Sequence, residues 1–326
     1  MSEQLLKIEN LVVEYTMEEE TVHAVNNISL SLNKGETLGL VGETGAGKTT
    51  TALSIMRLLP DRVGKIQGGK ILFKGEDLLE LKESDMRAIR GEDIAMIYQD
   101  PMTRLNPVLT VGNQIYEALL LHKKQSKEEM EARVDEILEL VGIPKERKVE
   151  YPHQFSGGMK QRVVIAMALA CEPELLIADE PTTALDVTIQ SQVLKMIFKL
   201  RDQMDMAMLL ITHDLGVVAQ TCNKVAVMYA GEIVEYGPIE DIFKGDCHHP
   251  YTDGLFGSIP KLNEETRRLK AIEGSLPDPT NLPEGCKFAP RCQYCTERCL
   301  KENPAMHVGS SENHFVKCHL RGGENA

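Results

Sequence analysis

The chain has 326 residues, 42% hydrophobic and 26% charged, a composition that excludes a disordered or fibrous protein. With 49 acidic and 36 basic residues its formal net charge is −13, so its surface is expected to repel nucleic-acid phosphates. The N-terminus lacks the basic patch and apolar run of a signal peptide, and no segment approaches about eighteen uninterrupted apolar residues. We therefore expect a cytoplasmic chain that does not itself span a membrane, with one large domain and a smaller one.

The first residues are predicted to form strands of an antiparallel sheet. Apolar residues alternate in 11–15 and again in 28–32, and acidic and Asn-rich turns separate the two runs. Residues 36–41 are predicted to be a short buried strand. A Gly-rich turn and an apolar run over 49–59 follow, and because Pro60 ends that run the pattern indicates strand, loop and helix.

The segment 102–152 is predicted to be a helical insertion. Ser126 and Glu129 have the spacing of a capping box, which marks the start of a helix, and Gly142 with Pro144 marks its end. One face of this helix is apolar, with Met130, Val134, Ile137, Leu138 and Val141.

Helices and strands are predicted to alternate after the insertion, which implies parallel strands with helical crossovers. The predicted elements are a helix over 157–170, a strand over 175–178, a helix over 187–202 and a strand over 206–212. A hairpin over 225–234 follows, with Gly231 close to its turn. After about Lys244 the composition becomes Pro-rich and then Cys-rich, so we place a domain boundary there.

A phosphate-binding loop is predicted at residues 42–49, Gly-Glu-Thr-Gly-Ala-Gly-Lys-Thr, which fit the pattern G-x-x-x-x-G-K-[ST] between a strand and a helix. An ordinary Gly-rich turn is the alternative, and the full spacing and context favour the phosphate loop. Lys48 would neutralise the β- and γ-phosphates, and Thr49 would offer its hydroxyl to Mg2+. The candidate nucleotide contacts are Gly42, Glu43, Thr44, Gly45, Ala46, Gly47, Lys48, Thr49 and Thr50.

Two acidic residues follow the predicted strand 175–178. Asp179 lies at the ligand-facing end of a parallel strand, where it could hold Mg2+ through water, and Glu180 is the candidate general base. The alternative is that both acids end the strand and cap the next helix. The phosphate loop in the same chain favours the catalytic interpretation.

The segment Phe155-Ser-Gly-Gly-Met159 resembles the signature motif of ABC ATPases. Ser156, Gly157 and Gly158 would form a second anion site at a helix N-terminus. The resemblance implies that the signature of one subunit closes on the γ-phosphate held by another, so that two chains sandwich two ATP molecules. It also implies an α/β P-loop NTPase fold: a RecA-like parallel-sheet core, an N-terminal antiparallel β subdomain, a helical subdomain over about 102–170 and a small Cys-rich C-terminal extension.

Further motifs are similar to those of the same family. Gln99 resembles the Q-loop glutamine, which senses Mg2+ and water and contacts the membrane subunit, so the implied Mg2+ set is Thr49, Gln99 and Asp179. Residues 184–186 resemble the D-loop. His213 resembles the switch histidine that contacts γ-phosphate, although by itself it would be a polar residue ending a strand. Tyr15 lies where the family places an aromatic ring on adenine, or it fills the small sheet.

The position after the signature glycines departs from the general family pattern, because Met159 stands where Gln is usual. The ATP-binding subunits of bacterial oligopeptide and dipeptide importers carry Met here in one of their two ATPases. The resemblance to them also covers 249–252 and 285–292, and thus essentially the whole chain. It implies an ATP hydrolase that powers peptide uptake, with a nucleotide-binding domain at 1–244 and an importer-type extension at 245–326; nickel or another small solute is the alternative cargo.

Five of the eight cysteines crowd into residues 286–318 of the C-terminal extension. Cys286, Cys292, Cys299 and Cys318 follow the spacing C-x5-C-x6-C-x18-C, with Cys295 as an alternative ligand. Clustered thiols in a reducing compartment are more often metal ligands than disulfides. Some similar proteins hold a [4Fe-4S] cluster there, so we expect one, with zinc and packed reduced thiols as alternatives.

The resemblance also implies partners and a location. We expect a second, non-identical ABC ATPase, two membrane permease subunits and, through the complex, an extracytoplasmic solute-binding protein, with this chain peripheral at the cytoplasmic face of the cell membrane. A soluble ABC ATPase acting on nucleic acid is the rival from another class, and the acidic charge counts against it. A regulatory subunit without turnover is a third alternative, which the presence of Lys48, Asp179, Glu180 and His213 disfavours.

Overall fold

The computed structural model describes residues 3–17, 20–99, 103–182, 186–258 and 272–321. The chain folds into two compact units. The first comprises residues 1–5, 32–37 and 77–211, and the second comprises 6–31, 38–76 and 212–326. None of the helices in the described ranges is both long and apolar enough to cross a lipid bilayer.

Three parallel strands form the centre of the first unit. They are β6 (Ile94–Ile97), β7 (Leu175–Asp179) and β8 (Ala207–Ile211), with β7 in the middle, and every residue in them is buried. Helices α5 (Gly157–Leu169) and α6 (Val187–Gln203) alternate with the last two strands. The predicted parallel strands with helical crossovers are therefore confirmed, with bounds within one residue of those expected.

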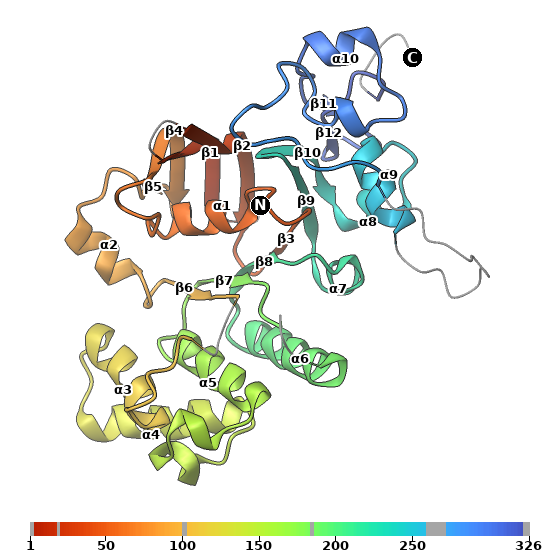
Figure 1. Ribbon diagram of the computed structural model, residues 1–326. Helices are drawn as coiled ribbons and strands as arrows, with labels where there is room; N and C mark the ends of the chain where they lie inside the picture. The colour runs from red at the N-terminus through yellow and green to blue at the C-terminus, as the bar shows by residue number, and fades with distance from the viewer. Residues whose placement is uncertain (1–2, 18–19, 100–102, 183–185, 259–271, 322–326) are drawn as a thin grey trace. The chain divides into compact units, whose positions relative to one another are not determined.

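The predicted helical insertion is also confirmed in the first unit. It holds α3 (Val111–His122), α4 (Lys127–Leu140) and two short 3-10 turns, η1 (Lys145–Val149) and η2 (Pro152–Gln154), and α3, α4 and α5 pack side by side (Figure 1). Ser126 and Glu129 make both hydrogen bonds of a capping box, so α4 begins where the sequence indicates. The first predicted residue of the insertion, Met102, lies outside the described residues. The short helix α2 (Glu83–Ile89) precedes β6.

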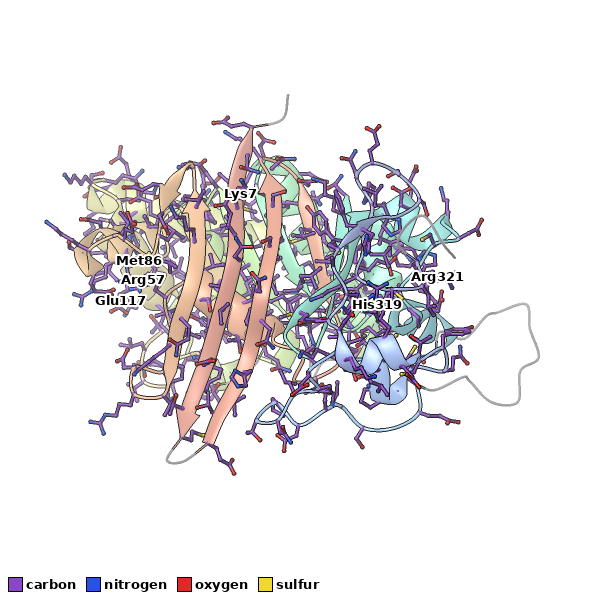
Figure 2. The ribbon with its side chains drawn as sticks, turned by 90° about the horizontal axis from the view of Figure 1, so that it is seen from above. Lys7, Arg57, Met86, Glu117, His319 and Arg321 are labelled. Atoms are coloured by element: carbon purple, nitrogen blue, oxygen red, sulfur yellow. The ribbon has the colours of Figure 1, made fainter. Side chains whose placement is uncertain are left out.

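A four-stranded sheet in the order β2-β1-β4-β5 occupies the N-terminal part of the chain. Its strands are β1 (Gln4–Met17), β2 (Glu20–Asn33), β4 (Gly64–Phe73) and β5 (Glu76–Asp77), and β1 pairs with β4 antiparallel. Figure 2 looks onto the long strands, with Lys7 of β1 labelled. Alternate residues Ile28, Leu30 and Leu32 are buried, as the sequence pattern predicts for a sheet with one face covered.

A second group of strands in the second unit leads to the phosphate loop. The strand β3 (Thr37–Val41) runs parallel to β9 (Lys224–Tyr229), and β9 forms the predicted hairpin with β10 (Glu232–Pro238). Two short strands from the end of the chain, β12 (Phe315–Val316) and β11 (His307–Val308), continue from β10 (Figure 1). Local sequence patterns do not predict this pairing, because each of these strands has two residues.

The remaining helices of the second unit are short. Helix α1 (Lys48–Ile55) begins one residue earlier than predicted and ends well before Pro60, because Arg57 adopts a left-handed conformation with φ of 50°. The others are α7 (Leu215–Thr221), α8 (Ile239–Lys244), α9 (Pro250–Gly257), η3 (Ala289–Arg291) and α10 (Glu297–Lys301). The boundary near residue 244 stays a prediction.

Candidate functional site

The loop between β3 and α1 has the geometry of an anion cradle. A Cβ added to Gly47 would lie only 2.4 Å from the carbonyl oxygen of Ala24, and a Cβ added to Gly42 would lie 2.1 Å from the carbonyl oxygen of Met228. Glycine is therefore required at both positions. Gly47 also has φ of 103° and gives α1 no side-chain cap, so the first N–H groups of the helix remain available for a phosphate.

Lys48 is held at the base of this loop. Its Nζ donates hydrogen bonds to the carbonyl oxygens of Gly42, at 2.8 Å, and of Glu43, at 3.0 Å, and the residue is only 6% exposed. A buried ammonium that donates to two loop carbonyls is already directed at the position where phosphates would lie. Thr44, Gly45 and Thr49 are exposed, which is what a loop that receives a ligand requires.

His213 and Tyr15 belong to the same unit as the phosphate loop. The N–H of Thr212 donates to the carbonyl of Leu40 at 3.4 Å, so the turn that carries the exposed His213 lies beside the end of β3. The hydroxyl of Tyr15 donates to Oγ1 of Thr50 at 3.3 Å, which places this ring next to α1. Both positions agree with the roles that the resemblance implies, and the roles themselves stay predictions.

The second group of candidate residues lies in the first unit, at the carboxyl ends of β6 and β7. Because Ile97 pairs with Ala178 in the parallel register, Gln99, Asp179 and Glu180 emerge at the same edge. The side-chain nitrogen of Gln99 donates to a carboxylate oxygen of Glu180 at 2.9 Å. Asp179 is 2% exposed, while Gln99 is exposed. The structure therefore brings together three residues that the sequence predicts for Mg2+ and water.

Glu180 has a backbone conformation that is unfavourable for its residue type. Its φ is +44°, in the left-handed region, where a residue other than glycine costs about 1–3 kcal/mol. Its N–H donates to the carbonyl of Ile211 at 2.9 Å, which holds the residue at the end of β7. Strain retained at the candidate general base supports a functional role more than a capping role, since a cap needs no left-handed backbone.

The signature segment begins α5 as predicted. The hydroxyl of Ser156 accepts from the N–H of Met159 at 3.4 Å, and Ser156 and Gly157 are exposed, whereas Gly158 faces Ile189. The sulfur of Met159 accepts from the guanidinium of Arg147 at 3.4 Å. Sequence reasoning missed Arg147, which lies twelve positions away in the 3-10 turn η1.

Arg147 is anchored on both sides of this contact. It forms an ion pair with Glu150 at 2.6 Å and lies over the ring of Phe155, 4.4 Å from its centroid. Of the predicted D-loop, Asp186 caps α6 by accepting from the N–H of Ile189 at 3.0 Å, and residues 184 and 185 lie outside the described residues.

The C-terminal cysteines collect in the second unit. The pKa of Cys286 is raised to about 11, first by burial and then by the neighbouring thiols of Cys299, Cys318 and Cys292. The N–H of Cys286 also donates to the carbonyl of Cys299 at 2.8 Å. These thiols are thus close enough to oppose one another's ionisation, and a bound metal cation would reverse that preference.

A hydrogen-bond network around a buried carboxylate lies outside the predicted site, and no sequence pattern indicates it. Glu235, wholly buried, accepts from Nε2 of His314 at 3.0 Å and lies 2.9 Å from Nδ1 of His248, and its other oxygen accepts from the N–H of His249 at 2.8 Å. Burial alone would raise its pKa, but these hydrogen bonds outweigh burial and lower the pKa to about 2.

Glu235, His248 and His314 place their polar atoms within 4.8 Å, the arrangement of a candidate metal site. The donor set does not fit a metal. Nδ1 of His314 accepts the N–H of Ser310, so Nε2 must carry the proton that it donates to Glu235. Nε2 of His248 donates to the carbonyl of Gly245, and Nδ1 faces the Glu235 carboxylate, which accepts, so Nδ1 carries a proton as well. The group is an ionic hydrogen-bond network.

Comparison with known proteins extends over nearly the whole chain. The family model "ABC transporter" matches residues 25–183, and the model "Oligopeptide/dipeptide transporter, C-terminal region" matches residues 234–299. The "Dipeptide transport ATP-binding protein DppD" of Bacillus subtilis (strain 168) is 52% identical over 98% of this chain and 95% of its own length. The chain belongs to the ABC transporter family.

Other members of the ABC transporter family are also similar. The "Oligopeptide transport ATP-binding protein AppD" of Bacillus subtilis (strain 168) is 47% identical over 99% of this chain and 98% of its own length. Among solved structures, the "ATP-binding cassette MJ0796 bound to ADP and Pi", described as a dimeric post-hydrolysis state, has a TM-score of 0.64 at 28% identity and covers 72% of this chain and 98% of its own. The cbiO1 structure from Clostridium perfringens has the same TM-score at 29% identity, over 74% and 91%. These comparisons confirm the predicted ABC ATPase fold.

Proposed function

We propose that this chain is the ATP-hydrolysing subunit of an ABC importer for dipeptides or oligopeptides. The observation that carries the proposal is the 52% identity to a dipeptide transport ATP-binding protein over 98% of this chain, which includes the C-terminal region as well as the nucleotide-binding motifs. The match of residues 234–299 to an oligopeptide and dipeptide transporter model supports the same cargo class.

The phosphate loop would bind the nucleotide. Backbone N–H groups within residues 44–50 would surround the β- and γ-phosphates, and Lys48 would move a hydrogen bond from a loop carbonyl to a phosphate oxygen. Thr49, Gln99 and Asp179 would hold Mg2+, which neutralises charge on the phosphates when it is bound. The oxygen ligands of this set suit that hard cation. Tyr15 would stack on the adenine.

Hydrolysis would then proceed by positioning of a water molecule. Glu180 would accept a proton from the water molecule while the water oxygen forms a bond to the γ-phosphorus. The bond between that phosphorus and the β-γ bridging oxygen would break at the same time, and ADP would leave. Gln99, which already donates to the Glu180 carboxylate, would orient both the base and the water. His213 would stabilise the charge that develops on the γ-phosphoryl oxygens.

The signature segment, with Ser156 and Gly157 exposed beside Gly158, would serve a nucleotide held by a second ATPase subunit. Because Met159 engages Arg147 and offers no amide to a nucleotide, we expect a non-identical partner whose signature differs. Two permease subunits and an extracytoplasmic solute-binding protein would complete the importer, with this chain peripheral at the cytoplasmic face of the membrane.

We further propose the domain layout 1–244 for nucleotide binding and 245–326 for the importer-type extension, with a [4Fe-4S] cluster on Cys286, Cys292, Cys299 and Cys318. The thiols lie close enough to raise the pKa of Cys286, which supports a metal group, and the resemblance to proteins that hold a cluster at these positions favours [4Fe-4S] over zinc. Anaerobic purification followed by iron, sulfide and zinc analysis tests this. About four irons per chain would support the cluster, and stoichiometric zinc or no metal would contradict it.

Uptake in cells tests the proposed transport function. A strain that lacks this chain should lose ATP-dependent uptake of labelled di- and oligopeptides, and the intact chain should restore it while a Lys48→Ala variant should not. Normal peptide uptake in the deletion strain, together with loss of nickel uptake, would refute the peptide assignment and favour the alternative cargo.

A further inference from the structure

One residue of the phosphate loop is bound by the C-terminal part of the chain. The guanidinium of Arg291 makes a bidentate ion pair with Glu43, with Nη1 to Oε2 at 2.6 Å and Nη2 to Oε1 at 3.1 Å. The hydroxyl of Tyr251 accepts the backbone N–H of Glu43 at 2.9 Å. Both partners come from more than 200 positions further along the sequence, and all three residues belong to the second unit.

The same loop residue also holds the phosphate-binding lysine. The carbonyl of Glu43 accepts from Nζ of Lys48 at 3.0 Å, while the N–H and the carboxylate of Glu43 are taken by Tyr251 and Arg291. All the polar groups of Glu43 are thus engaged, one toward Lys48 and the others toward the C-terminal residues. A displacement of Glu43 would therefore remove one of the two carbonyl oxygens that hold the Lys48 ammonium.

Arg291 is itself fixed in place. Its side chain is 5% exposed, its Nε donates to the carbonyl of Glu273 at 3.0 Å, and its guanidinium lies over the ring of Tyr229 at 5.8 Å. Tyr229 packs against Tyr251 and Phe288, with ring centroids 4.7 Å and 5.1 Å away. Buried rings and a backbone acceptor hold the guanidinium rigidly, so its contact with Glu43 restricts the loop and is not a mobile surface ion pair.

We propose that Arg291 and Tyr251 are positioning residues for nucleotide binding, and that the C-terminal region sets the affinity of the phosphate loop through Glu43. The inference rests on the proposed function, because it assumes that this loop binds nucleotide. Phosphoryl transfer depends mainly on the placement of charged groups. A region that fixes Glu43, and through it Lys48, therefore affects how the phosphates are bound and placed. It also gives a physical role to Arg291, which lies in the segment 285–292 that resembles the peptide-importer subunits.

Binding of ADP to the full-length chain, measured by isothermal titration calorimetry, tests the proposal. Arg291→Gln removes the guanidinium and with it the bidentate ion pair to Glu43. Tyr251→Phe removes only the hydroxyl and keeps the buried ring. Each should raise the dissociation constant by about fivefold or more, the lower end of energetic coupling between sites. Arg298→Gln is the matched control, because Arg298 lies in the same region, is 65% exposed and pairs with Glu302; it should bind as the unaltered chain does.

The stoichiometry of binding separates positioning from folding. A variant that merely unfolds in part would bind fewer equivalents of ADP with an unchanged dissociation constant, and that outcome would overturn the proposal. A double variant, Glu43→Gln with Arg291→Gln, should bind no more weakly than Glu43→Gln alone, since Arg291 acts through Glu43. Equal affinity of the unaltered chain, Arg291→Gln and Tyr251→Phe would refute this inference alone. Failure of the unaltered chain to bind nucleotide would refute the proposed function and this inference together.

Discussion

Replacement of Glu235 by Gln is expected to destabilise the second unit strongly. The substitution keeps the shape of the side chain but removes the charge that His248 and His314 address. The ordinary pKa of a glutamate is 4.5, and in the fold that of Glu235 is about 2. That difference corresponds to about 3 kcal/mol of preference for the carboxylate, and breaking a buried ion pair costs a similar amount.

The sign of the pH dependence follows from the direction of each pKa. Because the pKa of Glu235 is lowered, its contribution is present above about pH 4.5 and is lost as the pH falls toward 2. His248 has a raised pKa, so its contribution is full below 6.5 and is lost as the pH rises through the folded value. Burial lowers the pKa of His249 to about 4, so acidification from 6.5 to 4 destabilises the fold further.

Urea unfolding followed by circular dichroism at pH 7 and at pH 3 measures both effects. Glu235→Gln should lower the unfolding free energy by about 3 kcal/mol at pH 7, and by much less at pH 3, where the unaltered chain has lost part of the same contribution. Glu240→Gln is the control, because Glu240 is 77% exposed and pairs with Lys244. If the two variants unfolded within about 0.5 kcal/mol of each other at pH 7, the reasoning on Glu235 would be refuted.

The other predictions concern the nucleotide site and one helix. Glu180→Gln should bind ATP with Mg2+ normally and lose turnover in the assembled transporter, and undiminished ATPase activity would remove Glu180 as the base. Gly47→Ala should abolish nucleotide binding, since the new Cβ would lie 2.4 Å from a carbonyl oxygen. Gly45→Ala should bind nucleotide and cost only about 1–2 kcal/mol of backbone strain, because its new Cβ would have no atom within 4 Å. Ser126→Ala should lower the unfolding free energy by about 1 kcal/mol in urea titrations, and no change would show that the capping box contributes nothing.

The fold was predictable wherever the signal is local. The phosphate loop, the α4 capping box and the buried strand β7 are each specified within a few neighbouring residues, so spacing and hydrophobic period were sufficient. The end of α1 was not predicted, because Arg57 turns left-handed without a glycine to mark the position. The bounds of α5 and α6 were predicted within a residue, and the side chains of Ser156 and Asp186 cap the two helices where they begin.

The contacts between distant residues were beyond sequence reasoning. Glu43 and Arg291 are separated by 248 positions, and nothing in either local sequence says which carboxylate the arginine meets. The same holds for Glu235, whose partners lie 13 and 79 positions away, and for Arg147 with Met159, since a methionine carries no signal for an arginine partner. The candidate residues were therefore identified individually, while the groups that hold them in place required the structure.

The C-terminal region makes structural contacts with the residues that precede it. The composition changes near residue 244, yet β10 pairs with β12 from beyond that point, and the buried Glu235 of β10 requires His248 and His314 as partners. Arg291 then connects the same region to Glu43 of the phosphate loop. A carboxylate that is wholly buried is stable only with its partners present, so loss of the C-terminal residues would leave a buried charge in β10 and free Glu43 at once. Stability of this unit and the position of the phosphate loop are for this reason expected to change together.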